Sequence, residues 1–300
     1  MTGPGLHRQR VLVTGASGLI GHAAVRRFSA DGARVTAIGR PGEPGQSLLS
    51  IDLARDPWPE ARWDVIVHCA ARLPARFEGD EAAAASAENR AMDDRAIAAA
   101  AATNAHLVFL STASVYGATI GEIDDDTPAA PLLGYAREKL ASETAITARG
   151  LSATVFRLVA PYGPRQTRPT VLRRFLDAAL TGAPLRYYGS GARSQDFLHA
   201  DDVAIALALA ARERAAGRFL LASGVAISMG ELAHLVVEVT ASASVVEAAG
   251  VPDPEEGRTI RYRIDRLRQR LGFQPAVSLS DGLAAWAAVR REELARGVAS

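Results

Sequence analysis

The chain has 300 residues, of which 48% are hydrophobic and 22% are charged, an ordinary balance for a globular protein. Its 34 lysines and arginines nearly equal its 33 acidic residues, which argues against nucleic acid or a membrane surface as partners, because both require a basic excess. The sequence has no apolar run long enough for a membrane span, no secretory leader and one cysteine, Cys69, so we expect a cytoplasmic protein without disulfide or metal site.

Short apolar runs alternate with longer, alanine-rich stretches. The runs are mostly continuous, which is typical of parallel strands covered on both faces. In chain order, we predict strands over Arg10–Thr14, Arg34–Ile38, Ser47–Ile51, Asp64–His68, His106–Ser111, Ala153–Leu158 and Arg218–Leu221. We predict helices over Gly18–Ala30, Glu81–Thr103, Tyr135–Ala148 and Asp202–Ala215. This alternation predicts an α/β fold with a doubly wound parallel sheet.

The composition changes after about residue 161, where proline and glycine become frequent. Helices are predicted here over Thr170–Thr181 and Ser228–Thr240. The second begins with a capping box, in which Ser228 is the N-cap and Glu231 follows three residues later. We therefore predict a smaller C-terminal lobe over the carboxyl edge of the sheet.

A glycine turn joins the first predicted strand to the first helix. Gly15 permits a tight turn, Gly18 lets the backbone approach a pyrophosphate, and Gly21 lets the helix pack against the strand. The helix N-terminus then offers free N–H groups to the phosphates. The motif predicts a dinucleotide site, with further contacts from Ser17, Leu19 and Ile20.

The end of the second strand selects the cofactor. An acidic residue there would bind the ribose 2′-hydroxyl, whereas an arginine accommodates a 2′-phosphate. The chain has Gly39 and Arg40 at this point and no carboxylate. We therefore expect NADP(H), with Arg40 paired to the phosphate. The alternative is that Arg40 is solvated and other groups hold NAD(H).

A candidate catalytic group combines a helix with the strand before it. Tyr135 and Lys139 are four residues apart, so they share one helix face, and Thr112 ends the preceding strand. A neighbouring ammonium, and an oxidised nicotinamide when present, would lower the phenol pKa from its usual value near 10. Tyr135 could then exchange a proton with a substrate oxygen to which Thr112 donates a hydrogen bond. The alternative is a surface tyrosine, a solvated lysine and a strand-end threonine.

These motifs together resemble the extended short-chain dehydrogenase/reductases, the NAD-dependent epimerase/dehydratase family, over nearly the whole chain. The resemblance implies a Rossmann-like fold, a homodimer, and a small-molecule substrate that is usually a nucleotide-linked sugar. It places Lys139 on the nicotinamide ribose. We expect further cofactor contacts from Asp52, Leu53, Cys69, Ala70, Ala71, Tyr135 and Pro161, and substrate contacts from Thr112, Ser114, Tyr135 and Arg193. The same resemblance extends to Asn89, Arg157 and the segments 64–71, 161–164, 196–203 and 271–283.

The chain departs from the family pattern at several substrate positions. Ala113 and Ser114 stand where the family's dehydratases carry an Asp-Glu pair, so dehydration is rejected. Ala160 and Gln195 replace an asparagine and a diphosphate-binding arginine of many epimerases. Arginines that could replace the missing charge are Arg193 and Arg258, and others in the lobe are Arg165, Arg168 and Arg173, although each could equally be solvated.

We therefore expect a dinucleotide-binding domain over residues 1–161, to which the chain returns at about 194–221, and mainly a substrate-binding lobe over 162–300. The leading hypothesis is an NADPH-dependent ketoreductase acting on a sugar-type ketone, such as a nucleotide-linked 4-keto-deoxysugar. One alternative is a nucleotide-sugar 4-epimerase with tightly bound NAD, and another is a reductase of a non-sugar ketone. A redox-sensing binding protein is disfavoured, because such proteins tend to lose the catalytic tyrosine that Tyr135 supplies.

Overall fold

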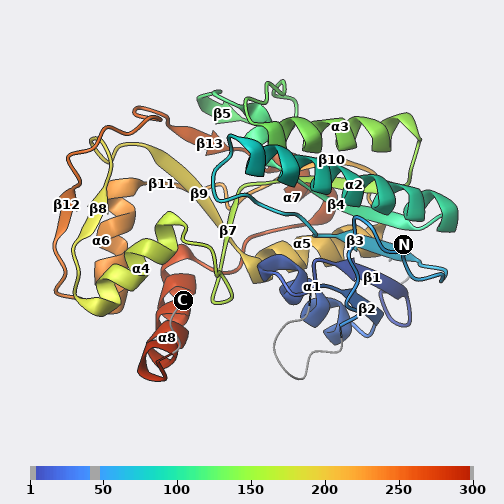
Figure 1. The fold of residues 1–300 in the computed structure, drawn as a ribbon, viewed down its shortest axis with the longest axis horizontal. Coiled ribbons are helices and arrows are strands. Elements are labelled where there is room, and N and C mark those ends of the chain that lie inside the picture. Colours follow the sequence, from blue (N-terminus) through green and yellow to red (C-terminus); the bar gives the residue numbers. More distant parts are fainter. Residues whose placement is uncertain (1–4, 41–47, 298–300) are drawn as a thin grey trace.

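A computed structural model describes residues 5–40 and 48–297, which form a larger and a smaller part (Figure 1). The larger part, here called the sheet domain, contains a six-stranded sheet with helices on both faces. The smaller part, here called the lobe, contains the helices α4 (Val171–Thr181), α6 (Met229–Thr240) and α8 (Leu279–Ala295) and several short strands, and the described chain ends on it.

The sheet has the strand order β10-β6-β4-β3-β1-β2, and every neighbouring pair is parallel. Its strands are β1 (Arg10–Thr14), β2 (Arg34–Ile38), β3 (Val65–His68), β4 (His106–Thr112), β6 (Ala153–Leu158) and β10 (Gly217–Leu221). This confirms the predicted doubly wound sheet. The order reverses between β1 and β3, and in such sheets ligands bind outside the carboxyl ends of the strands at this point.

Two helices cover each face of the sheet. They are α1 (Leu19–Ala30) and α5 (Ala200–Glu213) on one face, and α2 (Asp80–Thr103) and α3 (Gly134–Ala148) on the other. Successive strand residues point to opposite faces: Val11 packs in the cluster that holds Phe28 of α1, whereas Leu12 packs in the one that holds Ile97 of α2. Burial on both faces explains why the strand sequences are continuously apolar.

The lobe has its own apolar core. Its elements are β7 (Ala160–Tyr162), α4 (Val171–Thr181), β8 (Leu185–Tyr187), β9 (Ser194–His199), β11 (Ala226–Ser228), α6 (Met229–Thr240), β12 (Val246–Ala248) and α8 (Leu279–Ala295). Phe175, Leu232 and Trp286, one from each helix, pack together in that core. The capping box of α6 is confirmed, because Ser228 Oγ accepts from the Glu231 N–H and the Glu231 carboxylate accepts from the Ser228 N–H.

The chain returns from the lobe to the sheet domain twice. The first return is α5 and β10. The second was not predicted: β13 (Ile260–Tyr262) pairs with β5 (Gly121–Ile123), and α7 (Asp265–Leu271) packs against α5 and β10. The last helix, α8, then lies in the lobe.

Ser47, the first residue of the predicted strand over Ser47–Ile51, lies outside the described residues. Over the rest of this range the prediction is wrong, because no strand forms there. Leu49 forms only an isolated bridge with Ile38. The chain then turns, because the Asp52 carboxylate accepts the N–H of Ala54 and closes the segment before a strand can extend.

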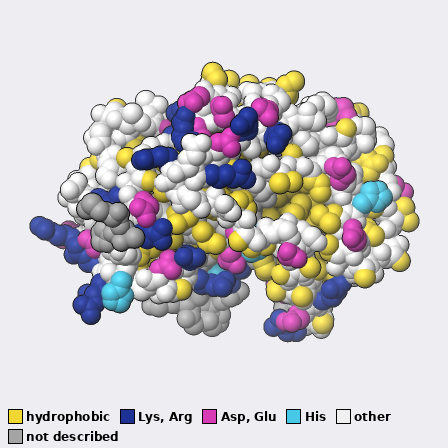
Figure 2. Space-filling model, turned by 180° about the vertical axis from the view of Figure 1, so that it is seen from behind, with side chains coloured by type: hydrophobic (Ala, Val, Ile, Leu, Met, Phe, Trp, Pro, Cys, Tyr) yellow, Lys and Arg dark blue, Asp and Glu magenta, His cyan; other side chains and the backbone are white. Residues whose placement is uncertain are grey.

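Within residues 5–40 and 48–297, no helix is both long and apolar enough to cross a membrane. Figure 2 shows basic and acidic side chains intermixed over the face it presents, rather than one sign gathered there.

Candidate active site

A cavity of about 1230 Å³ lies along the carboxyl ends of the sheet strands, between the sheet domain and the lobe. Gly15, Gly39 and Cys69 line it just after β1, β2 and β3, and Thr112 lines it at the end of β4. This is the position at which doubly wound sheets bind their ligands. The volume exceeds the usual 300–1,000 Å³ or so of a single small-molecule pocket, which leaves room for a cofactor and a substrate.

The glycine turn forms a cradle of closely packed backbone, in which Cβ atoms on two of its glycines would clash. Gly15 has a φ of +67°, and a Cβ there would lie 2.8 Å from the backbone nitrogen of Ala70. A Cβ on Gly21 would lie 2.1 Å from the carbonyl oxygen of Gly15. Gly18 is the N-cap of α1 and makes no side-chain capping bond. The turn therefore fits a dinucleotide pyrophosphate, which its backbone N–H groups would hold.

The structure brings the predicted cofactor residues together on the cavity wall, with one exception. Those that line it are Gly15, Ser17, Gly18, Leu19, Ile20, Gly21, Arg40, Asp52, Leu53, Cys69, Ala70, Ala71, Tyr135 and Pro161. The exception is Lys139, which lies outside the set of described residues that line the cavity. Burial raises the pKa of the Cys69 thiol to about 12, so this cysteine is neutral.

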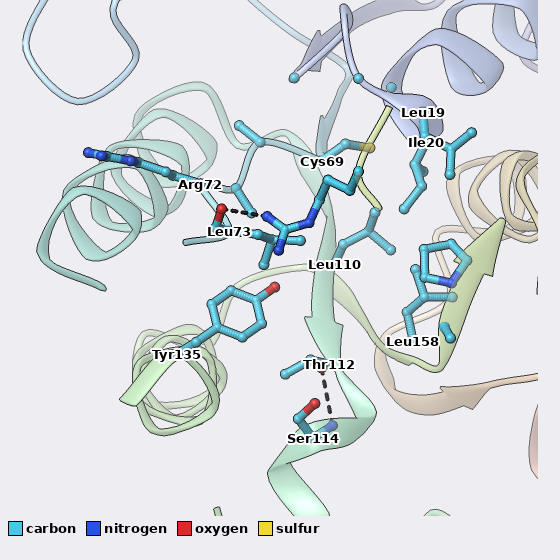
Figure 3. Close-up of a pocket in the computed structure, with 18 of the residues that line it drawn as sticks. Leu19, Ile20, Cys69, Arg72, Leu73, Leu110, Thr112, Ser114, Tyr135 and Leu158 are labelled. Carbon is cyan, nitrogen blue, oxygen red and sulfur yellow. Dashed lines mark hydrogen bonds between the residues drawn. The ribbon is translucent and has the colours of Figure 1, made fainter. Parts of the chain in front are cut away.

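Tyr135 and Thr112 point into the same part of the cavity (Figure 3). Tyr135 lies in the first turn of α3, and its ring packs against that of Phe77 at 6.2 Å. Thr112 is the N-cap of the short 3₁₀ helix η1 (Ala113–Tyr116), and its Oγ1 accepts the N–H of Ser114 at 3.1 Å. Because that bond uses a lone pair of Oγ1, the hydroxyl hydrogen remains available to a substrate oxygen.

The expected lowering of the Tyr135 pKa does not occur in this structure. Burial raises the pKa of the phenol, while the charges of Lys139 and Arg168 act to lower it and that of Asp93 acts to raise it. The expectation from the sequence considered the Lys139 ammonium, but it left out the burial of the phenol and the Asp93 carboxylate. Without cofactor, Tyr135 is therefore a phenol at neutral pH, the form that donates a proton.

Lys139 lies one helical turn beyond Tyr135, behind the cavity wall. It is 1% exposed, and its Nζ lies 2.9 Å from Asp93 Oδ1 on α2. Sequence reasoning missed Asp93, because an acidic residue in an alanine-rich helix resembles a solvated one. A signal existed: Asn89 and Asp93 are four residues apart, and both are buried on the same face of α2.

Arginine side chains of the lobe line the cavity, and within the described residues each of them already interacts with another group of the protein. Arg193 Nε donates to Asp253 at 2.8 Å, and its Nη1 lies 3.4 Å from Glu255. Arg258 Nη2 donates to the carbonyl of Gly117 at 2.8 Å. By contrast, Arg173 is buried on α4, bonds the Gln166 carbonyl, and does not line the cavity.

Arg168 crosses from the lobe to the sheet domain. Its guanidinium donates to the carbonyl oxygens of Leu73 and Pro74, at 2.5 and 2.9 Å. Figure 3 shows Leu73 above the hydroxyl of Tyr135. Asn89 fixes the same loop by exchanging two hydrogen bonds with the backbone of Arg72. The loop over Tyr135 is thus held from both sides.

The remaining residues of the family resemblance have structural roles. Arg157 is buried and paired with Glu143, with 2.8 Å between Nη2 and Oε2. Two aspartates of the segment 196–203 are buried and accept from backbone N–H groups: Asp196 from those of Ser223 and Gly224, and Asp202 from those of residues 276 and 277. These hydrogen bonds fix segments near the places where the chain passes between the sheet domain and the lobe.

Comparison with known proteins agrees with this geometry. The model of the NAD dependent epimerase/dehydratase family matches residues 11–221. The chain belongs to this family. Its glycine turn, Thr112 and Tyr135 all lie within the matched range, and the chain is an NAD(P)-dependent enzyme of the extended short-chain dehydrogenase/reductase type.

Individual family members are similar over different lengths. The UDP-glucose 4-epimerase of Mycolicibacterium smegmatis is 31% identical over an alignment of 307 positions, gaps included, which covers 92% of this chain and 96% of that protein. A dTDP-glucose 4,6-dehydratase of Streptomyces griseus is 34% identical over 189 residues, covering 60% of this chain and 57% of that protein. The structure of MoeE5 in complex with UDP-glucose and NAD aligns with a TM-score of 0.80 and 27% identity, over 95% of this chain and 99% of that one.

Proposed function

We propose that this enzyme is an NADPH-dependent ketoreductase of a nucleotide-linked sugar ketone, with Tyr135 as its proton donor. The observation that carries the proposal is the convergence of Tyr135 and Thr112 on one part of a cavity that begins at the glycine turn. When bound, the nicotinamide supplies the hydride. The residues of the chain must then orient the ketone and supply the proton.

Each polar group has a role in that reaction. The hydroxyl hydrogen of Thr112 polarises the ketone oxygen, and the phenol of Tyr135 donates a proton to it. The Lys139 ammonium stabilises the phenolate left behind, since it already acts to lower the phenol pKa. Arg168 adds a second positive charge in the same direction. Regeneration of the phenol from solvent completes the cycle.

The cofactor preference follows from Arg40. It lines the cavity just beyond β2, where the chain has no carboxylate to bind a ribose 2′-hydroxyl. Asp52 also lines this part, but its carboxylate already accepts from the Ala54 N–H and from Arg55, at 3.0 and 2.8 Å. A 2′-phosphate would pair with Arg40 by a charge-assisted hydrogen bond.

The substrate class follows from the family and from the lobe. The similar epimerase and dehydratase are named for UDP-glucose and dTDP-glucose, and MoeE5 was solved with UDP-glucose. We infer that Arg193 and Arg258 bind the diphosphate of such a substrate, because Gln195 carries no charge. Ser114 is a further candidate contact, as it lines the cavity beside Thr112.

The test is an absorbance assay at 340 nm with NADPH or NADH and a nucleotide-linked 4-keto-deoxysugar. We expect consumption of NADPH by the native enzyme and not by Tyr135→Phe. Arg40→Ser should weaken NADPH binding about tenfold or more and leave NADH unchanged, since it removes only the 2′-phosphate partner. Equal affinity of Arg40→Ser and native enzyme for NADPH would contradict the cofactor assignment.

A second candidate is a nucleotide-sugar 4-epimerase with tightly bound NAD. It is favoured by the full-length similarity to UDP-glucose 4-epimerase. The two functions differ in what leaves the enzyme, since an epimerase restores its own cofactor in each turnover. Mass analysis of the purified protein separates them: retained NAD, together with interconversion of UDP-glucose and UDP-galactose, would favour the epimerase. Reduction of simple ketones but of no nucleotide sugar would favour the non-sugar reductase. We also expect a homodimer, which light scattering can check.

A further inference from the structure

A carboxylate is buried beneath the active site, in the middle of α2. Asp93 is 0% exposed and contacts two other elements. Its Oδ1 lies 2.9 Å from Lys139 Nζ of α3 and 3.0 Å from His68 Nε2 of β3. Its Oδ2 accepts from the hydroxyl of Ser142, also at 2.9 Å. The carboxylate is therefore fully used, and none of its partners is solvent-facing.

The hydrogen bonds continue from Asp93 to the glycine turn. A carboxylate only accepts, so His68 Nε2 carries the proton and its Nδ1 accepts from the hydroxyl of Thr14, at 2.9 Å. Thr14 is the last residue of β1 and precedes Gly15. Its Oγ1 lies 3.4 Å from the N–H of Ala70, on the loop that a Gly15 side chain would strike. One chain of contacts thus joins the lysine behind Tyr135 to the phosphate-binding turn.

Charge balance explains why the cluster holds together. An isolated ammonium is costly to bury and would lose its proton, whereas a carboxylate in direct contact keeps it charged. Burial acts to lower the pKa of Lys139, but the adjacent Asp93 carboxylate, with a smaller contribution from Tyr135, outweighs it, so the pKa is raised. Burial lowers the pKa of His68, which is therefore neutral. The cluster holds one positive and one negative charge.

We propose that Asp93 is a positioning residue of the reaction, which keeps Lys139 as an ammonium beside Tyr135 and fixes it relative to the glycine turn. The role in catalysis rests on the proposed function, while the pairing with Lys139 does not. The consequence is that Lys139 stays charged and keeps its proton, while the neighbouring phenol of Tyr135 remains the group that donates a proton to the substrate.

Loss of the Asp93 carboxylate charge should lower the pH at which the Tyr135–Lys139 pair loses its first proton. The groups that act on the Tyr135–Lys139 pair are Asp93 from α2, neutral Cys69 after β3, and Arg168 from the lobe; His68 also contacts Asp93. Asp93→Asn makes this set more positive by one charge. Whichever of the two groups ionises first, its proton then leaves at lower pH.

The test is a pH titration of the enzyme without cofactor, with its tyrosines labelled at the ring carbon that carries the hydroxyl and followed by NMR. Tyr135→Phe identifies the Tyr135 signal, which reports its own ionisation and that of the ammonium beside it. We expect the first inflection of Asp93→Asn to lie about one pH unit or more below that of the native enzyme. Asp94→Asn is the matched control, because Asp94 is exposed on the same helix and pairs with Arg90. An unshifted inflection in folded Asp93→Asn would overturn the inference.

A second measurement keeps the inference testable if Asp93→Asn is too unstable to titrate. The double variant Asp93→Asn/Lys139→Met removes both charges and keeps similar volumes. It should melt at a higher temperature than Asp93→Asn alone, because no unpaired ammonium remains buried. Equal or lower melting would show that Asp93 does not serve Lys139.

Failure of the proposed function can be told apart from failure of this inference. Neither measurement needs substrate, so a shifted inflection in a protein without ketoreductase activity leaves the pairing intact and refutes the function. If the enzyme is active, the pH profile of kcat/KM should shift in Asp93→Asn in the same direction as the NMR inflection. An active enzyme with an unshifted profile and inflection refutes only the role of Asp93.

Discussion

The two walls of the active site hold their charges in different ways. On the sheet-domain side, Lys139 and Asp93 are buried in direct contact and are tied through His68 to the glycine turn. On the lobe side, Arg193 and Arg258 remain partly exposed, and each bonds Glu255, which is itself 44% exposed. The first wall is fixed before any ligand binds, while the second can exchange its partners for those of a substrate. We infer that the chemistry is built into the sheet domain and the specificity into the lobe.

The largest expected effect is on the sheet-domain wall itself. Tyr135→Phe removes the proton donor and should lower kcat by about 10²–10⁴-fold, the usual range for a positioned acid. Cofactor affinity should change little, because the glycine turn is untouched. Stopped-flow turnover and a fluorescence titration of NADPH measure the two quantities. A variant that retained a tenth or more of the native kcat would remove Tyr135 from the mechanism.

A smaller effect should follow from filling the glycine cradle. Gly21→Ala would bring a Cβ to 2.1 Å from the Gly15 carbonyl oxygen, so the backbone of the turn must move. We expect a loss of about 1–3 kcal/mol in unfolding free energy, as for other overpacked sites, together with weaker cofactor binding. Gly18→Ala is the comparison variant, and it should destabilise the fold less, because its Cβ would lie 3.2 Å from the same oxygen. Urea denaturation should rank Gly21→Ala as the more destabilising of the two; the reverse order would contradict the geometry.

The sheet domain should also be sensitive to acid through His106. This side chain is buried between β4 and β6 and bonds the hydroxyls of Ser152 and Thr154, and burial lowers its pKa to about 4. A histidine with a depressed folded pKa binds its proton more readily when unfolded, so stability falls as the pH drops from about 6.5 toward 4. The contribution is at most about 3 kcal/mol.

Replacing the imidazole isolates this contribution from those of the other histidines. His106→Gln should lose less stability than the native enzyme between pH 7 and pH 5, whatever its stability at pH 7. Urea denaturation at the two pH values gives the difference. Identical losses in the two proteins would show that His106 does not titrate in this window.

The smallest effects are expected on the lobe wall. Arg258→Ala should raise KM about tenfold and leave kcat within about twofold, because it removes binding that is the same in ground and transition states. Arg261→Ala, three residues further along the chain in β13, is the control, since its side chain is 73% exposed and does not line the cavity. Steady-state kinetics checks both. A large fall in kcat for Arg258→Ala would contradict the assignment of chemistry to the sheet domain and of specificity to the lobe.

The same contrast explains what could be predicted from the sequence. The glycine turn and Tyr135 could be proposed from local spacing alone, and in the structure both line the same cavity. Asp93 could not be assigned, because its importance arises only where α2 meets α3 and β3. Arg173 and Arg193 illustrate a further difficulty: both are arginines of the lobe, but only tertiary packing decides that the first is buried away from the cavity. Short strands such as β7, β8 and β11, with three residues each, carry too few residues to show a period.

The path of the chain has a practical consequence for engineering. It leaves the sheet domain at β7, returns through α5 and β10, leaves again at β11, returns for β13 and α7, and ends in the lobe at α8. The lobe is thus assembled from three separate stretches of sequence. A new substrate preference cannot be grafted by exchanging one continuous segment with a homologue; a chimera would need matched junctions at every crossing. Point substitutions on the cavity-facing arginines are the simpler route to altered selectivity.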